Sequence, residues 1–155
     1  MSKHGPWRTD DFEALSWHDA HVHGLNLDAF NPGEGTANLS LDIDYILEWK
    51  NVGAGFEFTV AQATLRFHEV FGLKIALDYE SPTAGMSPFA IDHIEREVIE
   101  RKYGSQTYRW TIAINWPVGS IEFQSPGFTQ ILVGESHVQG QQWLEEKDRN
   151  SPSAA

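Results

Sequence analysis

The 155-residue chain contains no cysteine. This absence excludes disulfide bonds, zinc sites built on thiolates, cysteine nucleophiles and iron–sulfur clusters. The chain also lacks long apolar runs: no segment approaches the roughly 18 consecutive apolar residues of a membrane helix, and residues 1–6 do not form the apolar part of a signal peptide. We therefore expect a cytoplasmic protein that makes no membrane contact.

Positive charge is scarce: the chain has 11 Lys and Arg residues and 22 Asp and Glu residues, which gives a formal net charge of −11. Such a surface repels a phosphate backbone, and no local basic patch offsets the repulsion. The densest group of basic residues lies within 96–102 and is interleaved with glutamates, as on a solvated face. We expect no nucleic-acid partner. The acidic charge serves solubility first and would also suit a basic protein partner.

Common catalytic signatures are missing as well. The chain has no G-x-S-x-G nucleophile turn, no phosphate-binding P-loop and no dinucleotide fingerprint. The glycines at 53 and 55 precede a strand-like run instead of a helix, which is typical of a turn. The usual nucleotide enzymes are therefore disfavoured.

What the chain does have is apolar alternation with a period of two. The composition is 41% hydrophobic with six Trp, nine Phe and four Tyr, enough for the core of one domain. The clearest strand covers residues 39–50, where apolar side chains alternate with polar ones. The turn at 31–35, Asn-Pro-Gly-Glu-Gly, joins it to the segment 18–30 and predicts an antiparallel hairpin.

Further alternating runs predict about seven or eight strands. They cover residues 56–60, 65–67, 73–79, 108–115, 121–123 and 128–133. Strands of this number, joined by short turns, favour an all-β fold, either an antiparallel sandwich or a flattened barrel. Residues 91–102 fit both a helix and a strand that turns back through Gly104. We favour the strand, and a helix there would make the fold a β-rich α+β fold.

Three segments follow from these patterns. Residues 1–16 form an N-terminal segment in which Thr9 caps a short helix over residues 10–15, with Phe12 and Leu15 facing the body. Residues 17–138 form a single antiparallel β domain. Residues 139–155 form a polar, partly disordered tail.

The most concentrated chemistry lies in the cluster formed by His18, Asp19, His21 and His23. On a strand, Asp19, His21 and His23 share one face, and His21 and His23 could lean inward with the leucines that follow. Two strand positions separate Cα atoms by about 7 Å, so both imidazoles could reach one zinc or other divalent ion, with Asp19 or His68 as a third ligand.

Two other interpretations of the cluster stay open. In the structural one, which we favour, Trp17, His18 and Asp19 anchor the first strand, while His21 and His23 are surface residues. In the other, the histidines perform acid–base chemistry, because an imidazole titrates near neutral pH. We accordingly expect no cofactor, with a divalent metal at His21 and His23 as the alternative.

Asp42 and Asp44 point to the same face of the strand at 39–50. Paired carboxylates can carry out acid–base chemistry or bind calcium, but without a visible apolar cleft we expect them to face solvent. Across the hairpin, one of them could lie beside His18.

The tryptophans divide into two groups. Trp49 and Trp110 lie on apolar strand faces and are predicted to be core residues. Trp116 precedes a proline at a turn and Trp143 lies in the polar tail. These two are the candidates for an exposed contact surface, because exposed tryptophan is enriched at interfaces.

Several short motifs carry a resemblance that covers most of the chain. They are the Trp-His-Asp opening at 17–19, Leu-Asp-Ile-Asp-Tyr at 41–45, Ala-Thr-Leu-Arg-Phe at 63–67 and Gly-Ser-Ile at 119–121. In this order they resemble a group of small uncharacterised bacterial all-β proteins. Part of that group looks like the small acidic immunity proteins that neutralise toxins in contact-dependent competition. The resemblance implies a cytoplasmic single domain and carries over no catalytic residue.

Three functional classes remain. The first, which we favour, is a noncatalytic protein-interaction or binding domain, of which an immunity protein is one version. The second is a metal- or histidine-dependent enzyme that uses the cluster at 18–23. The third is a barrel that binds an apolar small molecule between sheets lined by Phe and Trp.

Overall fold

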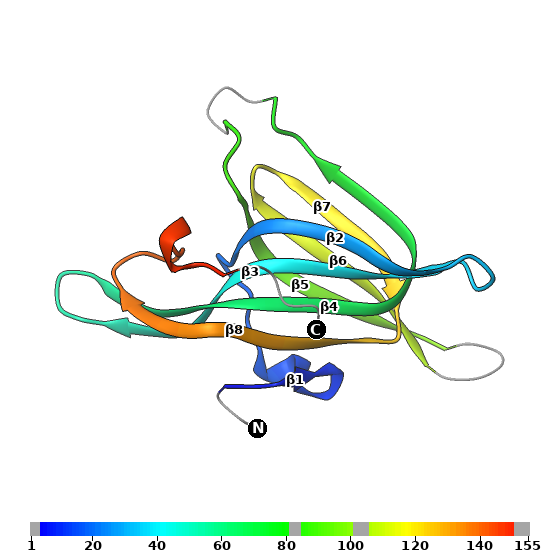
Figure 1. The fold of residues 1–155 in the computed structure, drawn as a ribbon, viewed down its shortest axis with the longest axis horizontal. Coiled ribbons are helices and arrows are strands. Elements are labelled where there is room, and N and C mark those ends of the chain that lie inside the picture. The colour runs from blue at the N-terminus through cyan, green and yellow to red at the C-terminus, as the bar shows by residue number, and fades with distance from the viewer. Residues whose placement is uncertain (1–3, 81–84, 101–105, 151–155) are drawn as a thin grey trace.

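Eight strands form one antiparallel sheet in the computed structural model, which describes residues 4–80, 85–100 and 106–150 (Figure 1). The strands are β1 (Trp7–Arg8), β2 (His21–Asn31), β3 (Thr36–Asn51), β4 (Phe56–Leu77), β5 (Phe89–Ile99), β6 (Thr107–Trp116), β7 (Gly119–Ser125) and β8 (Gly127–Gln139). Their order is β1-β8-β4-β3-β2-β5-β6-β7, and a further pairing joins the last strand of this order, β7, back to β4. The all-β prediction is confirmed. No helix in the described ranges is long and apolar enough to cross a membrane.

The 22-residue β4 belongs to both layers of the fold. Up to His68 it pairs with β8, and from Phe71 onward it pairs with β7. We predicted three short runs here because the buried face changes along the strand: Phe58 and Val60 point outward, whereas Leu65 points into the core. One layer thus contains β2, β3, β8 and the first part of β4, and the other contains β5, β6, β7 and the rest of β4 (Figure 1).

Two predicted pairings are confirmed. The turn at 31–35 joins β2 and β3 into an antiparallel hairpin. The ambiguous segment 91–102 contributes most of strand β5, which pairs with β6. The predicted turn at Gly104 lies outside the described residues.

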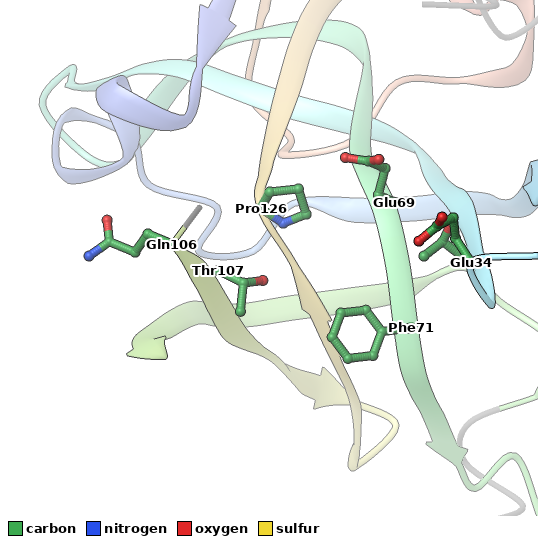
Figure 2. A pocket seen from close by; sticks show the side chains of 7 residues that line it. Glu34, Glu69, Phe71, Gln106, Thr107 and Pro126 are labelled. Atoms are coloured by element: carbon green, nitrogen blue, oxygen red, sulfur yellow. The ribbon is translucent and has the colours of Figure 1, made fainter. Parts of the chain in front are cut away.

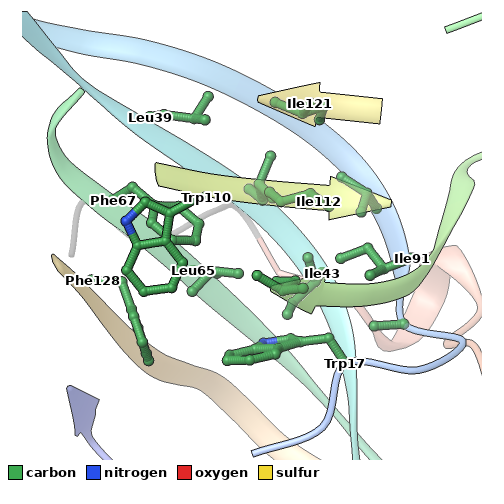
Figure 3. Packing of buried hydrophobic residues seen from close by; sticks show 14 of the residues in the cluster. Trp17, Leu39, Ile43, Leu65, Phe67, Ile91, Trp110, Ile112, Ile121 and Phe128 are labelled. Atoms are coloured by element: carbon green, nitrogen blue, oxygen red, sulfur yellow. The ribbon is translucent and has the colours of Figure 1, made fainter. Parts of the chain in front are cut away.

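The interior between the layers is filled by aliphatic and aromatic side chains (Figure 3). Phe67 lies 5.0 Å from Trp110 and 4.7 Å from Phe123 between ring centroids, in edge-to-face arrangements. Such aromatic pairs stabilise by about 0.5–1.5 kcal/mol each beyond their buried area. The indole N–H of Trp17 donates to Oε1 of Gln130 over 2.7 Å, so this polar atom is satisfied inside the core. The prediction of a core position is confirmed for Trp110.

The same prediction is wrong for Trp49, whose side chain is 44% exposed. The register between β3 and β4 shifts between Ile46 and Glu48, where β3 carries one extra residue. A bulge of this kind reverses which face the following side chains occupy. Trp49 therefore lies on the outer face, with its ring 4.8 Å from that of Phe58.

The predicted N-terminal helix is a single 3₁₀ segment, η1 (Thr9–Ala14). Thr9 does not cap it: Arg8 is the N-cap residue, and its backbone N–H donates to the Asp11 carboxylate over 2.8 Å. The Thr9 hydroxyl instead accepts the backbone N–H of Phe128 over 3.0 Å and so ties η1 to β8. Phe12 packs against the core, as predicted.

The polar segment after β8 lies against the outer face of β3 and β4 over residues 140–150. Leu144 is buried with Ile46, Phe58 and Val60 in a small apolar cluster outside the main core. A second 3₁₀ segment, η2 (Glu146–Asp148), leads to Arg149. Residues 151–155 of the predicted tail lie outside the described residues.

Candidate functional site

The histidines of β2 lie on the outer face of the sheet. His21 pairs directly with Asp44, and the register then shifts between Val22 and Gly24, so that His23 is an extra residue in β2. Val22 is buried in the core, and Leu25 packs against it. The inward orientation of His21 and His23 considered for the alternative metal site is wrong, because this bulge lets the leucines turn inward while the histidines stay on the outer face.

The Asp44 carboxylate is the centre of a polar network on this outer face. Its side chain is completely buried, with 0% exposure. Nε2 of His23 lies 2.7 Å from Oδ2 of Asp44, and the backbone N–H of Leu144 donates to the same oxygen over 3.0 Å. The guanidinium of Arg149 forms ion pairs with both Asp44 and Asp42.

Residues 140–150 seal this network from solvent. The backbone N–H of Asn150 donates to Oε1 of Gln62 over 2.6 Å, and Nε2 of Gln62 donates back to the Asn150 carbonyl over 2.8 Å. The same amide nitrogen also donates to Asp42 over 3.0 Å. The prediction that Asp42 and Asp44 face solvent is wrong, because the returning chain brings a cation and several donors to them.

Burial changes the proton affinity of the imidazoles in this network. It lowers the pKa of His23 to about 4, and the positive charge of Arg149 adds to the effect. Burial also lowers the pKa of His21, against a smaller opposing effect of its hydrogen bond to the Asp19 carbonyl. His23 is therefore neutral at neutral pH, and its Nε2 carries the hydrogen that it donates to Asp44.

The residues considered for the alternative metal site do not converge in the described part of the chain. Within the part of the chain that the structure describes, no group of three His, Asp or Glu side chains could hold a metal ion. His68 lies six residues along β4 from Gln62, the cross-strand partner of Asp44, which is about 20 Å on an extended strand. Its Nε2 lies 2.8 Å from the Thr129 hydroxyl instead.

Asp19 forms a second polar junction at the entry to β2. Its backbone adopts a φ of 64°, and β2 starts only at His21, so Asp19 does not share a strand face with the histidines. Its carboxylate accepts hydrogen bonds from Asn115 and Gln142, each over 2.9 Å. Asp19 therefore joins the start of β2, the end of β6 and the C-terminal segment.

Sequence reasoning did not identify Asn115, Gln142 or Arg149 as partners of these carboxylates. Each is an ordinary polar residue separated by about a hundred positions from the aspartate that it contacts. No local pattern reports such a distant pairing. The one available signal was the excess of strand aspartates over nearby cations.

Partly exposed aromatic residues gather around Asp19, and we call this surface the aromatic end. His18 lies against Trp49 with near-parallel rings 6.3 Å apart. Trp143, next to Gln142 in the chain, lies 5.4 Å from the ring of His21. The surface comprises His18, Trp49 (44% exposed), Phe56 (55%) and Trp143 (44%), and Trp116 (46% exposed) follows Asn115, whose amide binds Asp19. The exposed positions predicted for Trp116 and Trp143 are confirmed, and Trp49 joins them.

Comparisons with protein-family models, with curated proteins and with solved structures found no match to this chain.

Proposed function

We propose that this protein is a noncatalytic binding domain that acts in the cytoplasm and holds a protein partner on its aromatic end. The observation that carries the proposal is the exposure of Trp49 and Trp143 beside one polar junction, with the exposed Trp116 next in the chain to its member Asn115. Tryptophan dominates the energetics of many protein interfaces, because it buries a large rigid surface at low entropic cost. An immunity protein, as the resemblance of the sequence motifs implies, is one version of this function.

The polar network around Asp44 supports a binding domain more than an enzyme. His23, the imidazole nearest to the buried carboxylates, is occupied by Asp44 and held neutral. The guanidinium of Arg149 fills the space next to both carboxylates. Groups already paired within the fold stabilise it and are not free to bind or transform a substrate.

Charge indicates the kind of partner. The chain carries a formal charge of −11, and at the aromatic end Asp19 and Asp92 lie beside His18, with the Asp92 carbonyl 3.0 Å from the His18 ring. A basic protein surface complements this arrangement and accelerates association. We therefore expect a basic partner whose binding weakens as salt is added.

The test is affinity capture from cells that produce the protein, followed by identification of the retained proteins. The bait is the full chain, and the matched variant is Trp49→Ser combined with Trp143→Ser. Both side chains are partly exposed, so the substitutions remove contact surface without opening the core. We expect a basic protein that the original chain retains and that the double variant loses.

The control variant is Val98→Ser, which removes a comparably exposed apolar side chain from β5. It should retain the same protein as the original chain. Equal capture by all three baits, or reproducible capture of no protein, would contradict the proposal.

A further inference from the structure

Two strand edges face each other across an open seam in the sheet. β2 pairs with β5 only through His21 and Val22, and in the described ranges its remaining residues have a strand partner only in β3. Beyond Val70, β4 has left β3 and pairs with β7 on one side. We call the space between residues 23–31 of β2 and residues 71–77 of β4 the seam.

Two hollows along the seam show that side chains of both strands line it. One, of about 440 Å³, is bordered by Leu27 and Phe30 of β2 and by Phe71 and Leu73 of β4. The other, of about 300 Å³, is bordered by Val22, Leu25, Leu77, Tyr79, Met86 and Phe89. The seam is thus apolar at its base and follows β2 over most of the length of that strand.

We propose that the seam binds an extended segment of a partner protein as an added strand along the free edge of β2. A strand edge presents backbone N–H and C=O groups that only another extended chain satisfies in register. The apolar hollows beside it would accept every second side chain of that segment, since side chains alternate between the two faces of a strand. This inference goes beyond the proposed function, because the seam and the aromatic end share no residue.

Acidic side chains near one end of the seam indicate which residues should flank the apolar part of the bound segment. Glu34 and Glu69 lie on the same side of a hollow whose wall also includes Phe71 (Figure 2). Phe71 also borders the larger hollow of the seam, so the two hollows are adjacent. The bound segment therefore has alternating apolar residues with lysine or arginine where it leaves the seam next to Glu34 and Glu69.

The experiment titrates the full chain with a capped peptide of alternating valine and threonine that has two lysines at each end, monitored by backbone amide NMR. We expect slower hydrogen exchange along residues 23–31 and chemical-shift changes confined to the residues that border the seam, 22–31, 71–79 and 86–89. The same peptide with an N-methyl group on every valine and threonine has no backbone N–H left to donate from either edge of that segment and should bind at least about tenfold more weakly, the effect of losing 1.4 kcal/mol.

Phe30→Ser is the matched protein variant, because Phe30 borders the seam and is 68% exposed, so that its loss leaves the core intact. It should weaken the peptide about tenfold, whereas the aromatic-end variant Trp49→Ser with Trp143→Ser should bind it unchanged. If the peptide does not bind the seam, the proposed function at the aromatic end is unaffected. If no partner binds the aromatic end, the inference about the seam is likewise unaffected.

Several outcomes overturn the inference. These are no shift of the β2 amides at millimolar peptide, equal binding of the N-methylated peptide, and slow exchange of the β2 edge amides before any peptide is added. Protection of the same amides that appears only as the protein concentration rises would assign the seam to a second copy of this chain and would equally overturn it.

Discussion

The imidazole of His23 donates its Nε2 hydrogen to the buried carboxylate of Asp44 across 2.7 Å. The two residues come from neighbouring strands, and the bulge in β2 brings His23 within reach. Because burial and Arg149 keep His23 neutral, the contact joins a neutral donor to a charged acceptor.

Acid should weaken the fold through His23. The unfolded chain binds the His23 proton near its ordinary pKa of 6.5, whereas the folded chain binds it only near about 4. As the pH falls through this window the unfolded state takes up more protons, so the free energy of unfolding decreases. Urea unfolding of the original chain and of His23→Gln at several pH values measures the effect. We expect the free energy of unfolding to depend less steeply on pH in the variant. Equal slopes for the two proteins would contradict a lowered pKa of His23 in the folded state.

Removal of Arg149 should destabilise the protein strongly. Arg149→Met leaves the buried Asp44 without its countercharge, and breaking a buried ion pair from one side costs about 3–5 kcal/mol. Lys147→Met is the control: its side chain is 75% exposed, and its loss should change stability by less than about 0.5 kcal/mol. Denaturant unfolding gives both values. Adding Asp44→Asn to Arg149→Met should restore part of the loss, and a further loss instead would refute the pairing.

Trp17→Phe should cost about 1–3 kcal/mol, because it leaves a buried side-chain oxygen of Gln130 without its donor. The matched change Trp143→Phe, at a partly exposed ring, should stay within about 0.5 kcal/mol. Thermal unfolding of the two variants tests the difference. Similar melting temperatures would show that the Trp17 hydrogen bond contributes little.

Gly127→Ala should loosen the N-terminal segment. A Cβ at this position would overlap the hydroxyl of Thr9, which fixes η1 to β8. We expect a cost of about 1–3 kcal/mol, as for other overpacked sites. The cost should be smaller in a Thr9→Gly background, where the obstacle is absent, and a double-mutant cycle measures this coupling. Gly55→Ala, at an open turn, is the control, and strict additivity of the first two changes would contradict the contact.

The strands could be predicted from the sequence, but the β-bulges within them could not. Alternation at 39–46 predicted which side chains of β3 point inward, because burial on one face imposes a period of two. One extra residue near 47 reversed the pattern and moved Trp49 to the surface. Nothing in the side chains there marks the insertion, since bulges depend on pairing with the neighbouring strand.

The candidate site shows the same limit at longer range. The sequence suggests that Asp42 or Asp44 could lie beside His18, whereas in the structure Asp44 contacts His23 and His18 contacts Asp92. The environment of the paired aspartates of β3 depends on the returning segment 140–150, which lies next to β3 only in the folded chain. The sequence predicts a polar tail for residues 139–155, yet Arg149 of this segment pairs with Asp44, which would otherwise face water.

This return has a consequence for how the protein is made. Asp42 and Arg149 are 107 positions apart, so a ribosome completes β3 long before it adds the cation that neutralises it. Domains generally fold during or soon after synthesis, beginning with the parts made first. The ion pairs and hydrogen bonds on the outer face of β3 can therefore form only after the segment 140–150 has been synthesised.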